Sequence, residues 1–383
     1  MNILCLNKIS PVGMKVLPSS YKVTEDINEA DAILVRSAAM HEMVLPKRVV
    51  AVARAGAGVN NIPLDVYAKT GVVVFNTPGA NANAVKELTI AAMLLAARDI
   101  RGSMEWVKAN KDDELINKSM EKAKGAFAGT EILGKTLGVI GCGAIGALVA
   151  QAAGALGMHV IGVEPSEATI ERNKHLFPKD MEIVSYDELY KRADYISIHV
   201  PLLDATKGML NKEAFAKMKD GVIIVNCARD AIVNDNDLEE AIKAGKVRRY
   251  VTDFPNHKTA NMEGVVAISH LGASTEEAED NCAMMAIEEL KDFIENGNIT
   301  HSVNYPDVNA GAKSGQIRVC VNHRNAPGII ANYSNAISVN GGNIVNLVSK
   351  SKGDYAYSVF DVDGKVEADK IAKLEGVIRV RVI

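Results

Sequence analysis

Three glycines at a fixed spacing are the first candidates for chemistry, in the segment Gly141-Cys-Gly143-Ala-Ile-Gly146. They directly follow an apolar run at residues 136–140 and open an alanine-rich helical run at residues 147–156. A strand, a glycine turn and a helix let a pyrophosphate approach the helix N-terminus, where free N–H groups and the helix dipole favour negative charge. The spacing therefore predicts a dinucleotide-binding turn, with a glycine-rich packing turn as the alternative.

A carboxylate stands at the end of the next predicted strand. Residues 160–163 are apolar and Glu164 follows them, 18 residues beyond Gly146. A carboxylate at this point can accept hydrogen bonds from both ribose hydroxyls, and it would repel the extra phosphate of NADP. We therefore predict NAD rather than NADP as the cofactor.

Most other polar candidates also stand directly after an apolar run. In open α/β sheets, ligands bind beyond the carboxyl ends of the strands. The residues at these positions are Arg36, Arg54, Asn76, Gly141, Glu164, Pro201, Asn226 to Arg229, Asp253 and His270. We expect two arginines, a histidine and the phosphate-binding turn to meet in one cleft.

His270 and Arg229 are the candidates for the reaction itself. Histidine exchanges a proton near neutral pH, so His270 could take a hydroxyl proton while a hydride leaves for a nicotinamide. The guanidinium of Arg229 can grip a carboxylate with two hydrogen bonds and polarise the adjacent carbonyl. Asp253 could hold the nicotinamide amide or cap the next turn. A hydrogen-bonded core histidine and a surface salt bridge are the plain alternatives for His270 and Arg229.

The strands and helices that must position these residues alternate along the chain. Short runs rich in Val and Ile alternate with longer helical patterns, which is typical of βα units and parallel sheets. Strands are predicted at residues 3–6, 32–35, 49–53, 72–75, 136–140, 160–163, 195–200, 222–225, 250–252 and 265–269. Helices are predicted at residues 87–98 and 276–295, and a Lys-rich span at residues 108–124 is expected to cross between domains.

The last part of the chain follows a different pattern. Residues 307–315 are small and polar, which predicts a linker. The remaining residues have a β-α-β-β-α-β order that is typical of a small ferredoxin-like module.

The bulk composition narrows the function classes. The 383 residues are 48% apolar and 23% charged, which is ordinary for a soluble protein of two or three domains. A net charge of −4 weighs against nucleic-acid binding, and no apolar run is long enough to span a bilayer. The five cysteines are scattered without metal-ligand spacing, so we expect no metal site and predict reduced thiols in a cytoplasmic protein.

Together these stretches resemble the D-2-hydroxyacid dehydrogenase family over nearly the whole chain. The matching motifs are Val35-Arg36-Ser37, Arg54-Ala-Gly-Ala-Gly58, Asn76-Thr77-Pro78, Gly141 to Gly146, His199-Val-Pro201 with Thr206, Asn226-Cys-Ala-Arg229, Asp253 and His270-Leu-Gly272. The resemblance implies two Rossmann-like, doubly wound α/β domains plus a small α+β module. It implies a substrate-binding domain at residues 1–98 with 286–306, an NAD-binding domain at residues 99–285, and a regulatory domain at residues 316–383.

The same resemblance assigns roles to individual residues. Arg229 matches the family's substrate-binding arginine, and His270 matches its acid/base histidine. The implied substrate-binding residues are Arg36, Ser37, Arg54, Ala57, Gly58 and Asn76. The implied cofactor-binding residues are Gly141, Gly143, Ala144, Ile145, Gly146, Glu164, Pro201, Thr206, Cys227, Ala228, Asp253 and Gly272.

Two features point to one branch of the family. Arg36 and Arg54 resemble the arginines with which phosphoglycerate dehydrogenases bind the substrate phosphate, and two arginines suit a dianion far better than lactate. The C-terminal module resembles an ACT domain, a regulatory unit that binds amino acids. In it, His323, Asn325 and Asn343 match serine-binding motifs and would contact L-serine across a subunit interface. A purely structural dimerisation module is the alternative.

Two positions depart from the family pattern. Family members carry a glutamate a few residues after the counterpart of Asp253, where it hydrogen-bonds the catalytic histidine. No glutamate stands there in this chain; His257 falls near that position and cannot act as a carboxylate. We therefore hypothesise that His270 works without the usual anionic partner. The family's glycine after the arginine is Asp230 here, and its side chain must point away from the anion site.

The sequence thus predicts NAD-dependent oxidation of D-3-phosphoglycerate to 3-phosphohydroxypyruvate, in the phosphorylated route to L-serine. The enzyme is expected to be a cytoplasmic homodimer or homotetramer with L-serine as its effector and no nucleic-acid or membrane partner. Another anionic 2-hydroxyacid, such as 2-hydroxyglutarate or 4-phosphoerythronate, is the first alternative substrate. A non-catalytic NAD sensor is the second alternative, and a nucleic-acid regulator is a distant third.

Overall fold

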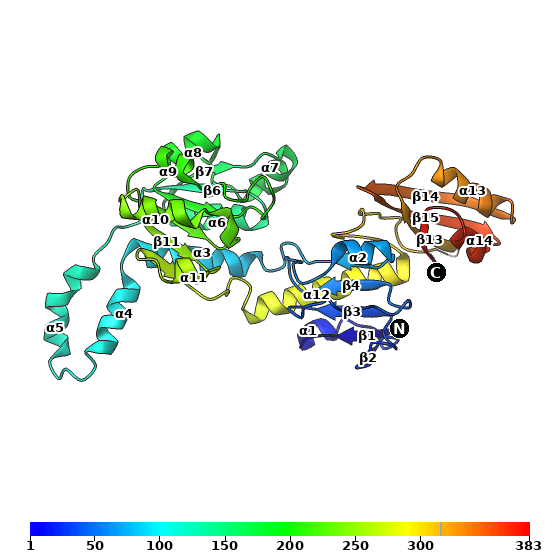
Figure 1. Ribbon diagram of the computed structural model, residues 1–383, viewed down its shortest axis with the longest axis horizontal. Helices are drawn as coiled ribbons and strands as arrows, with labels where there is room; N and C mark the ends of the chain where they lie inside the picture. Colours follow the sequence, from blue (N-terminus) through cyan, green and yellow to red (C-terminus); the bar gives the residue numbers. More distant parts are fainter. Residues whose placement is uncertain (315) are drawn as a thin grey trace. The chain divides into compact units, whose positions relative to one another are not determined.

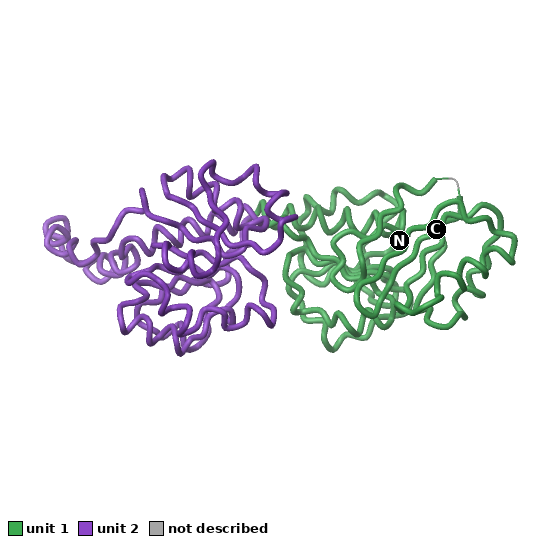
Figure 2. Tube along the Cα trace, turned by 90° about the horizontal axis from the view of Figure 1, so that it is seen from above, with its two compact units in different colours: residues 1–81, 276–383 green, residues 82–275 purple. Residues whose placement is uncertain are grey.

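The structure is a computed structural model that describes residues 1–314 and 316–383. The chain forms two compact units, one made of residues 1–81 with 276–383 (unit 1) and the other of residues 82–275 (unit 2), coloured green and purple in Figure 2. Gly315, at the end of the predicted linker, lies outside the described residues.

Unit 2 is built on a seven-stranded sheet in the order β12-β11-β10-β9-β6-β7-β8, with every neighbouring pair parallel. Its strands are β6 (Thr136–Ile140), β7 (His159–Val163), β8 (Glu182–Ile183), β9 (Tyr195–Ile198), β10 (Val222–Asn226), β11 (Val247–Thr252) and β12 (Val265–Ala267). The strand order reverses between β6 and β9, which is the point where a doubly wound sheet binds its ligand. The predicted Rossmann arrangement is confirmed.

Helices cover both faces of this sheet (Figure 1). Alternate residues of β10 face opposite sides, since Ile223 and Val225 belong to one apolar cluster and Val222 and Ile224 to another. The helices are α3 (Ala82–Ala97), α4 (Ile100–Ala109), α5 (Ile116–Ala123), α6 (Ala144–Ala155), α7 (Glu167–Asn173), α8 (Tyr186–Arg192), α9 (Lys212–Lys217), α10 (Asp235–Lys243) and α11 (His257–Ala260), with short 3-10 turns η1 (Lys124–Phe127), η2 (Lys174–Leu176) and η3 (Asp230–Ile232).

Unit 1 contains a smaller parallel sheet in the order β2-β1-β3-β4-β5. Its strands are β1 (Asn2–Cys5), β2 (Lys22–Thr24), β3 (Ala32–Val35), β4 (Ala51–Arg54) and β5 (Val73–Phe75), and its helices are α1 (Pro11–Met14), α2 (Leu64–Lys69) and α12 (Glu276–Asn296). Helix α12 returns from far along the chain and buries Leu290 and Phe293 in one cluster with Leu34 and Ala53. The helix α1 packs on it so closely that a Cβ on Gly13 would lie 2.5 Å from the Cβ of Ala283.

The end of the chain forms a separate antiparallel sheet in the order β14-β15-β13-β16. Its elements are β13 (Ile317–Arg324), α13 (Ile329–Ser338), β14 (Gly342–Lys352), β15 (Tyr355–Gly364), α14 (Ala368–Ala372) and β16 (Val377–Val382). One face of the sheet buries Val319, Val321 and Phe360 against residues of both helices. The ferredoxin-like module expected from the sequence is therefore present.

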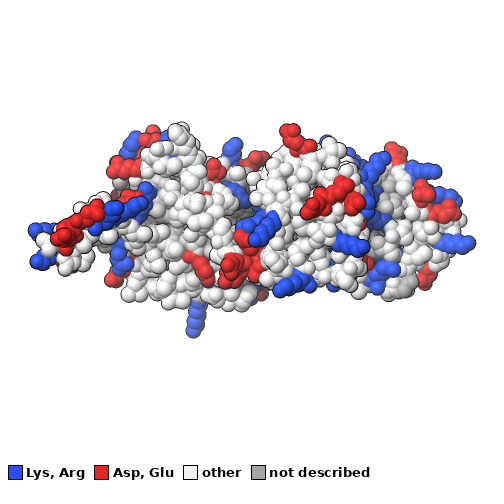
Figure 3. All heavy atoms as spheres, turned by 90° about the horizontal axis from the view of Figure 1, so that it is seen from below, with Lys and Arg blue, Asp and Glu red and all other residues white. Residues whose placement is uncertain are grey.

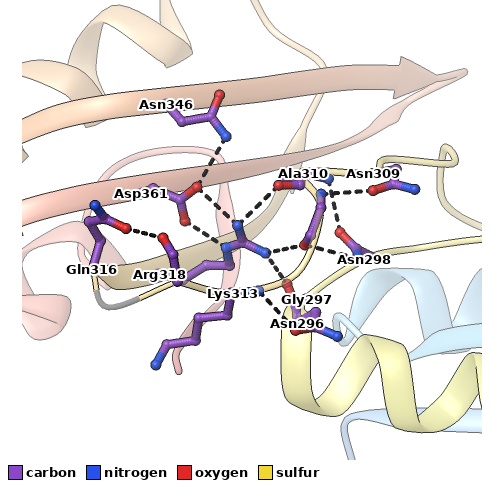
Figure 4. Close-up of polar contacts among 12 residues, drawn as sticks. Asn296, Gly297, Asn298, Asn309, Ala310, Lys313, Gln316, Arg318, Asn346 and Asp361 are labelled. Atoms are coloured by element: carbon purple, nitrogen blue, oxygen red, sulfur yellow. Dashed lines mark hydrogen bonds and ion pairs between the residues drawn. The ribbon is translucent and has the colours of Figure 1, made fainter.

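A buried arginine joins this module to the end of α12 (Figure 4). Arg318 is 1% exposed and makes two bonds to the carboxylate of Asp361, with Nε–Oδ1 at 2.6 Å and Nη2–Oδ2 at 2.9 Å. It also donates to the carbonyls of Asn296, Gly311 and Ala310 at 2.7, 2.8 and 3.1 Å. Within the predicted linker, the carbonyls of Ala310 and Gly311 therefore bind a buried guanidinium and tie this part of the chain to the module.

The expected domain boundaries need correction at both crossings. Residues 82–98 were assigned to the substrate-binding domain, but α3 packs against α6, β10 and β11 of unit 2. Residues 276–285 were assigned to the NAD-binding domain, but the first turns of α12 pack on α1 in unit 1. The Lys-rich span at residues 108–124 does not cross between units either, since α4, α5 and η1 all lie within unit 2.

Charges of both signs are mixed on the surface. Figure 3 shows Lys and Arg side chains interspersed with Asp and Glu side chains over the face that it draws. Among the described residues, no helix is both long and apolar enough to cross a membrane.

Candidate active site

Each of the three glycines in the turn between β6 and α6 has a different geometric role. Gly141 has a φ of +89°, a backbone angle that residues with a side chain rarely adopt. A Cβ on Gly146 would lie 1.9 Å from the carbonyl oxygen of Gly141, so only glycine allows the helix to pack on the strand. A Cβ on Gly143 would meet nothing within 4 Å. Gly143 therefore leaves open space at the start of α6, where Ala144 and Ile145 carry first-turn N–H groups.

Replacing Gly143 by Ala tests this reading. We expect the variant to fold with an unchanged melting temperature, because the new methyl group clashes with nothing. We expect its affinity for NADH to fall about tenfold or more, the scale on which one misplaced methylene acts in a binding site. Fluorescence titration with NADH and thermal unfolding measure the two quantities. Gly146→Ala is the contrasting variant and should destabilise the fold itself; unchanged NADH affinity in Gly143→Ala would contradict the assignment.

Glu164 lies at the rim of the same turn. Its Oε2 accepts the N–H of Cys142 and its Oε1 accepts the N–H of Ser166, both at 3.0 Å. The amide of the buried Asn173 donates to the Cys142 carbonyl at 3.0 Å, which fixes the middle of the turn from the other side. The carboxylate is half-buried at the end of β7, where ribose hydroxyls can donate to it.

The loop after β9 begins beside the glycine turn, because the His199 N–H donates to the Ile140 carbonyl at 2.8 Å. Its shape is fixed by Thr206, whose hydroxyl donates to the Pro201 carbonyl at 2.6 Å and accepts the N–H of Leu203 at 2.8 Å. Pro201 and Thr206, both predicted cofactor residues, thus belong to one small structure on the same side of the sheet.

Arg229 is presented by a loop that a buried asparagine organises. Asn226, fully buried at the end of β10, accepts the N–H groups of Ala228 and Arg229 at 3.0 and 3.3 Å. Its amide donates to the Arg229 carbonyl and to the hydroxyl of Tyr250 at 2.8 and 2.9 Å. Cys227, within the loop, is buried. The guanidinium of Arg229 donates to the Ala228 carbonyl at 2.6 Å.

Asp253 is a buried carboxyl group with one unused oxygen. It is 1% exposed, and burial raises the pKa of its carboxyl despite the Gly272 N–H, which donates to Oδ2 at 3.0 Å. Its Oδ1 has no hydrogen-bond partner among the described residues. A buried acceptor without a donor is costly, so this atom fits a ligand amide such as that of nicotinamide.

His270 meets Arg229 at a single aromatic ring. The imidazole of His270 lies 4.3 Å from the centre of the Phe254 ring, and the guanidinium carbon of Arg229 lies 5.0 Å from it. His270 is exposed, so the alternative of a core histidine is wrong. His257, near the expected position of the family's glutamate, begins α11 directly after the Asn256 cap and is exposed.

Asp230 stands directly after Arg229 in the chain. It begins η3 and is exposed, while the neighbouring Arg229 is half-buried against Phe254.

In unit 1, Arg36 directly follows β3, and Arg54 is the last residue of the neighbouring strand β4. The Arg54 Nε donates to the Arg36 carbonyl at 2.9 Å, and Arg36 Nη1 pairs with Oε1 of Glu279 at 2.7 Å. Asn7 fixes the loop after β3, because its Oδ1 accepts the N–H groups of Arg36, Ser37 and Ala38, each at 3.0 Å. The two arginines are therefore held side by side at the carboxyl edge of this sheet.

The predicted carboxylate-binding loop lies next to them. A Cβ on Gly56 would lie 2.9 Å from Nη1 of Arg54, so a glycine lets the guanidinium pass close to the backbone. The amide of Asn76 donates to the Ala57 carbonyl at 2.6 Å and ties the loop to the end of β5. Ala57 and Gly58 are half-buried.

The C-terminal module brings together two of the three predicted effector residues. A cavity of about 250 Å³ is lined by His323, Asn325, Gly328, Ser349, Lys350 and Ser351, among others. Asn343 is exposed near the other end of β14, where it pairs with Asp363 of β15. Within one chain, Asn343 is therefore apart from the cavity.

Both ring nitrogens of His323 form hydrogen bonds within the module. Its Nδ1 donates to the Arg324 carbonyl at 2.8 Å, so its Nε2 is free of a proton and accepts the hydroxyl of Ser358, also at 2.8 Å. Burial lowers the pKa of this imidazole. The polar groups that can bind a ligand in this cavity therefore belong to residues beside His323.

Sequence reasoning missed the positioning roles of three residues. Asn7 follows β1 in the way that the other candidates follow their strands, so the same strand-end rule could have found it. Asn226 was listed among the strand-end residues, but no role was assigned to it. The contact of Phe254 with both reaction-site residues left no signal in the sequence, because it depends on the path of the chain after β11.

Three separate observations indicate that the residues of unit 2 can bind a dinucleotide. These are the open side of Gly143, the carboxylate of Glu164 at the rim and the unpaired Oδ1 of Asp253. Within residues 1–314 and 316–383, no cluster of three His, Cys, Asp or Glu side chains could hold a metal ion.

Comparison with known proteins places the chain in a family. Residues 90–272 match the family described as D-isomer specific 2-hydroxyacid dehydrogenase, NAD binding domain. The chain is 37% identical over 295 residues to a hydroxypyruvate reductase from Thermotoga maritima, across 74% of this chain and 86% of the relative. It is 37% identical over 283 residues to a D-3-phosphoglycerate dehydrogenase from Mycobacterium leprae, across 72% of this chain and 51% of the relative.

The crystal structure of an NAD⁺-bound 3-phosphoglycerate dehydrogenase from Entamoeba histolytica is similar with a TM-score of 0.63 at 26% identity, across 79% of this chain and 98% of that chain. The chain spans about half the length of the Mycobacterium leprae relative. It spans 86% of the Thermotoga maritima relative. With its glycine turn, rim carboxylate and unpaired buried acceptor at one sheet edge, the chain belongs to the D-isomer specific 2-hydroxyacid dehydrogenase family and is an NAD-dependent oxidoreductase.

Proposed function

We propose that the protein oxidises D-3-phosphoglycerate to 3-phosphohydroxypyruvate, the first step of the phosphorylated route to L-serine. The observation that carries this choice is the pair of arginines at neighbouring strand ends, joined by the bond from Arg54 Nε to the Arg36 carbonyl at 2.9 Å. Two guanidinium groups side by side can share a phosphate dianion. The D-3-phosphoglycerate dehydrogenase named among the relatives supports the same substrate.

The residues of this chain divide the work in the reaction. Arg229 binds the substrate carboxylate and polarises the carbonyl that forms at the neighbouring carbon. His270 takes the proton of the substrate hydroxyl and returns one in the reverse direction. NAD, when bound, accepts the hydride from the carbon that carries this hydroxyl. Arg36 and Arg54 bind the phosphate, and Ser37, Ala57, Gly58 and Asn76 line the place of the substrate.

The direct test is NADH production from D-3-phosphoglycerate, with Arg54→Ala compared against wild type. We expect the KM for D-3-phosphoglycerate to rise about tenfold or more, because a hydrogen bond to a charged group contributes about 1.5–3 kcal/mol. Arg48→Ala in the same unit is the matched control, since Arg48 pairs with Asp31 at the surface. An unchanged KM in Arg54→Ala would remove the phosphate assignment.

A second candidate substrate comes from the Thermotoga maritima relative, which is named a hydroxypyruvate reductase and is covered over 86% of its length. Two sets of rates distinguish the candidate substrates. They are the rate of hydroxypyruvate reduction with NADH and the rates of 2-hydroxyglutarate and 4-phosphoerythronate oxidation with NAD. A strong preference for hydroxypyruvate, unaffected by Arg54→Ala, would favour that relative's reaction. NADH binding without turnover of any hydroxyacid would indicate an NAD sensor instead.

We further propose that the module of residues 316–383 is an ACT domain that binds L-serine. The cavity beside His323 offers the side chains of Asn325 and Lys350, which suit the carboxylate and hydroxyl of an amino acid. Asn343 would then act from a second copy of the chain, as the expected contact across a subunit interface requires.

The regulatory proposal predicts a selective loss. Asn343→Ala should keep the turnover of D-3-phosphoglycerate and lose the response to L-serine, because Asn343 is exposed on β14 of the C-terminal module, where it pairs with Asp363. Initial rates with and without L-serine measure both quantities. Wild-type rates that do not change with L-serine would contradict an effector role for this amino acid.

We also propose that the chain acts as a homodimer or homotetramer in the cytoplasm. Helices α4 and α5 bury none of their residues, and Figure 1 shows them extending from the rest of unit 2. Met104, Val107 and Met120 on these helices are 67%, 48% and 46% exposed, an apolar surface that a second copy would cover. The five cysteines are unpaired in the described structure, in keeping with a reducing compartment.

A further inference from the structure

Phe254 contacts both groups that the proposed reaction needs. Its ring centre lies 4.3 Å from the ring centre of His270, with the two planes at 45°, and 5.0 Å from the guanidinium carbon of Arg229. Both contacts lie inside unit 2, on the loops that follow β10, β11 and β12. One aromatic side chain therefore supports the imidazole and the guanidinium together.

The position of Phe254 is itself well fixed. It follows the buried Asp253 directly, and its N–H donates to Oγ1 of Thr252 at 3.0 Å. Thr252 is the last residue of β11 and is fully buried. The ring thus lies two residues beyond the end of β11, on a loop that begins with buried residues, so it can act as a rigid support.

The contacts of the two side chains with this ring are not ion pairs. Among the described residues, neither Arg229 nor His270 forms a direct ion pair, although the buried carboxyl group of Asp253 interacts electrostatically with both. The guanidinium of Arg229 donates to the Ala228 carbonyl. An aromatic face attracts cations and stacks on planar groups, so it can orient both side chains.

The ring is not needed for the core. Phe254 is half-buried, and the apolar clusters formed by the described residues of unit 2 do not include it. A packing role would place it among those buried residues. Its two neighbours are instead the candidate acid/base and the candidate anion-binding group.

We propose that Phe254 is a positioning residue of this active site, holding the imidazole of His270 and the guanidinium of Arg229 at one ring. The proposal rests on the function proposed above.

Three variants test the proposal: Phe254→Leu, Phe254→Tyr and the control Phe177→Leu, which alters a partly buried ring packed on a core cluster of unit 2. We expect Phe254→Leu to lower kcat/KM for D-3-phosphoglycerate about 10- to 100-fold, the range in which a misplaced catalytic group acts. Its melting temperature and NADH affinity should stay unchanged. Phe254→Tyr should retain most activity because the ring is kept, and Phe177→Leu should change stability rather than turnover.

A kinetic isotope effect separates positioning from general damage. With deuterium at the carbon that loses hydride, Phe254→Leu should show a larger effect on kcat than wild type, because the chemical step becomes slower than product release. Wild-type kinetics in Phe254→Leu, or equal losses in the Leu and Tyr variants, would overturn the role of the ring while leaving the proposed function intact. A wild-type chain that turns over no hydroxyacid would overturn the proposed function, and this proposal with it.

Discussion

His270→Gln is expected to lower kcat for D-3-phosphoglycerate oxidation by about 10²–10⁴-fold, the contribution of a general acid–base group. Glutamine keeps a polar side chain of similar reach but cannot take the hydroxyl proton. The affinity for NADH should hold, because His270 is exposed and contacts Phe254 rather than the glycine turn. Steady-state rates between about pH 5.5 and 8 and fluorescence titration with NADH measure these quantities.

The matched control for this variant is His257→Gln. His257 is also exposed and lies on the same segment of unit 2, at the start of α11, so it should tolerate the change. Wild-type turnover in His270→Gln, with a rate that does not vary over the same pH range, would discard the acid/base role. A loss in both variants would indicate that the segment, rather than one imidazole, is sensitive.

Arg229→Lys is expected to reduce kcat/KM by about 10²–10³-fold, similar to the loss of one donor from an oxyanion-binding site and equal to roughly 3–4 kcal/mol of transition-state stabilisation. Lysine keeps the charge but loses the planar fork that grips a carboxylate with two bonds. It also loses the planar group that lies 5.0 Å from the Phe254 ring centre. Initial rates with D-3-phosphoglycerate and NAD, over a range of substrate concentrations, give the ratio.

Arg248→Lys is the control for this second change, because Arg248 is an exposed arginine on β11 of the same unit. It should behave as wild type. If Arg229→Lys kept its kcat/KM, charge alone would explain the role of residue 229, and the bidentate grip on the substrate carboxylate would have to be given up.

These two variants separate the two halves of the reaction site. In the proposed reaction His270 takes a proton, so its loss should appear mainly in kcat. In the same proposal Arg229 binds the substrate carboxylate and polarises the developing carbonyl, so its loss should appear in both kcat and KM. Asn226 makes three hydrogen bonds to the Arg229 loop and one to the Tyr250 hydroxyl, which explains how the arginine is kept in place before substrate arrives.

The sequence predicted the central strands well because they are buried on both faces. Runs such as residues 136–140 and 222–225 are apolar without alternation, which a parallel sheet between two helix layers requires. The edge strands β2 and β8 were missed because they are short and mostly exposed, so they carry no apolar run. The glycine turn was also predictable, since its three glycines and their strand and helix lie within about twenty consecutive residues.

The limits of the domains could not be predicted in the same way. Helix α3 is rich in Ala, Leu and Met and could pack on either sheet, and only its contacts with α6, β10 and β11 assign it to unit 2. Arg318 is another example, because a charged residue inside a strand suggests an exposed position. Its actual burial depends on Asp361, 43 residues later, and on carbonyls of residues 296, 310 and 311.

By itself, the sequence determined the parallel α/β class, the dinucleotide turn, the choice of NAD through Glu164, and the polar residues at the strand ends. These depend on local spacing and on burial patterns, which neighbouring residues encode. Only the tertiary structure decided what meets across the chain, namely that His270 and Arg229 share the ring of Phe254 and that Asn7 holds the loop of Arg36. Such contacts join residues far apart in sequence, and their geometry follows from how strands and loops pack rather than from any local pattern.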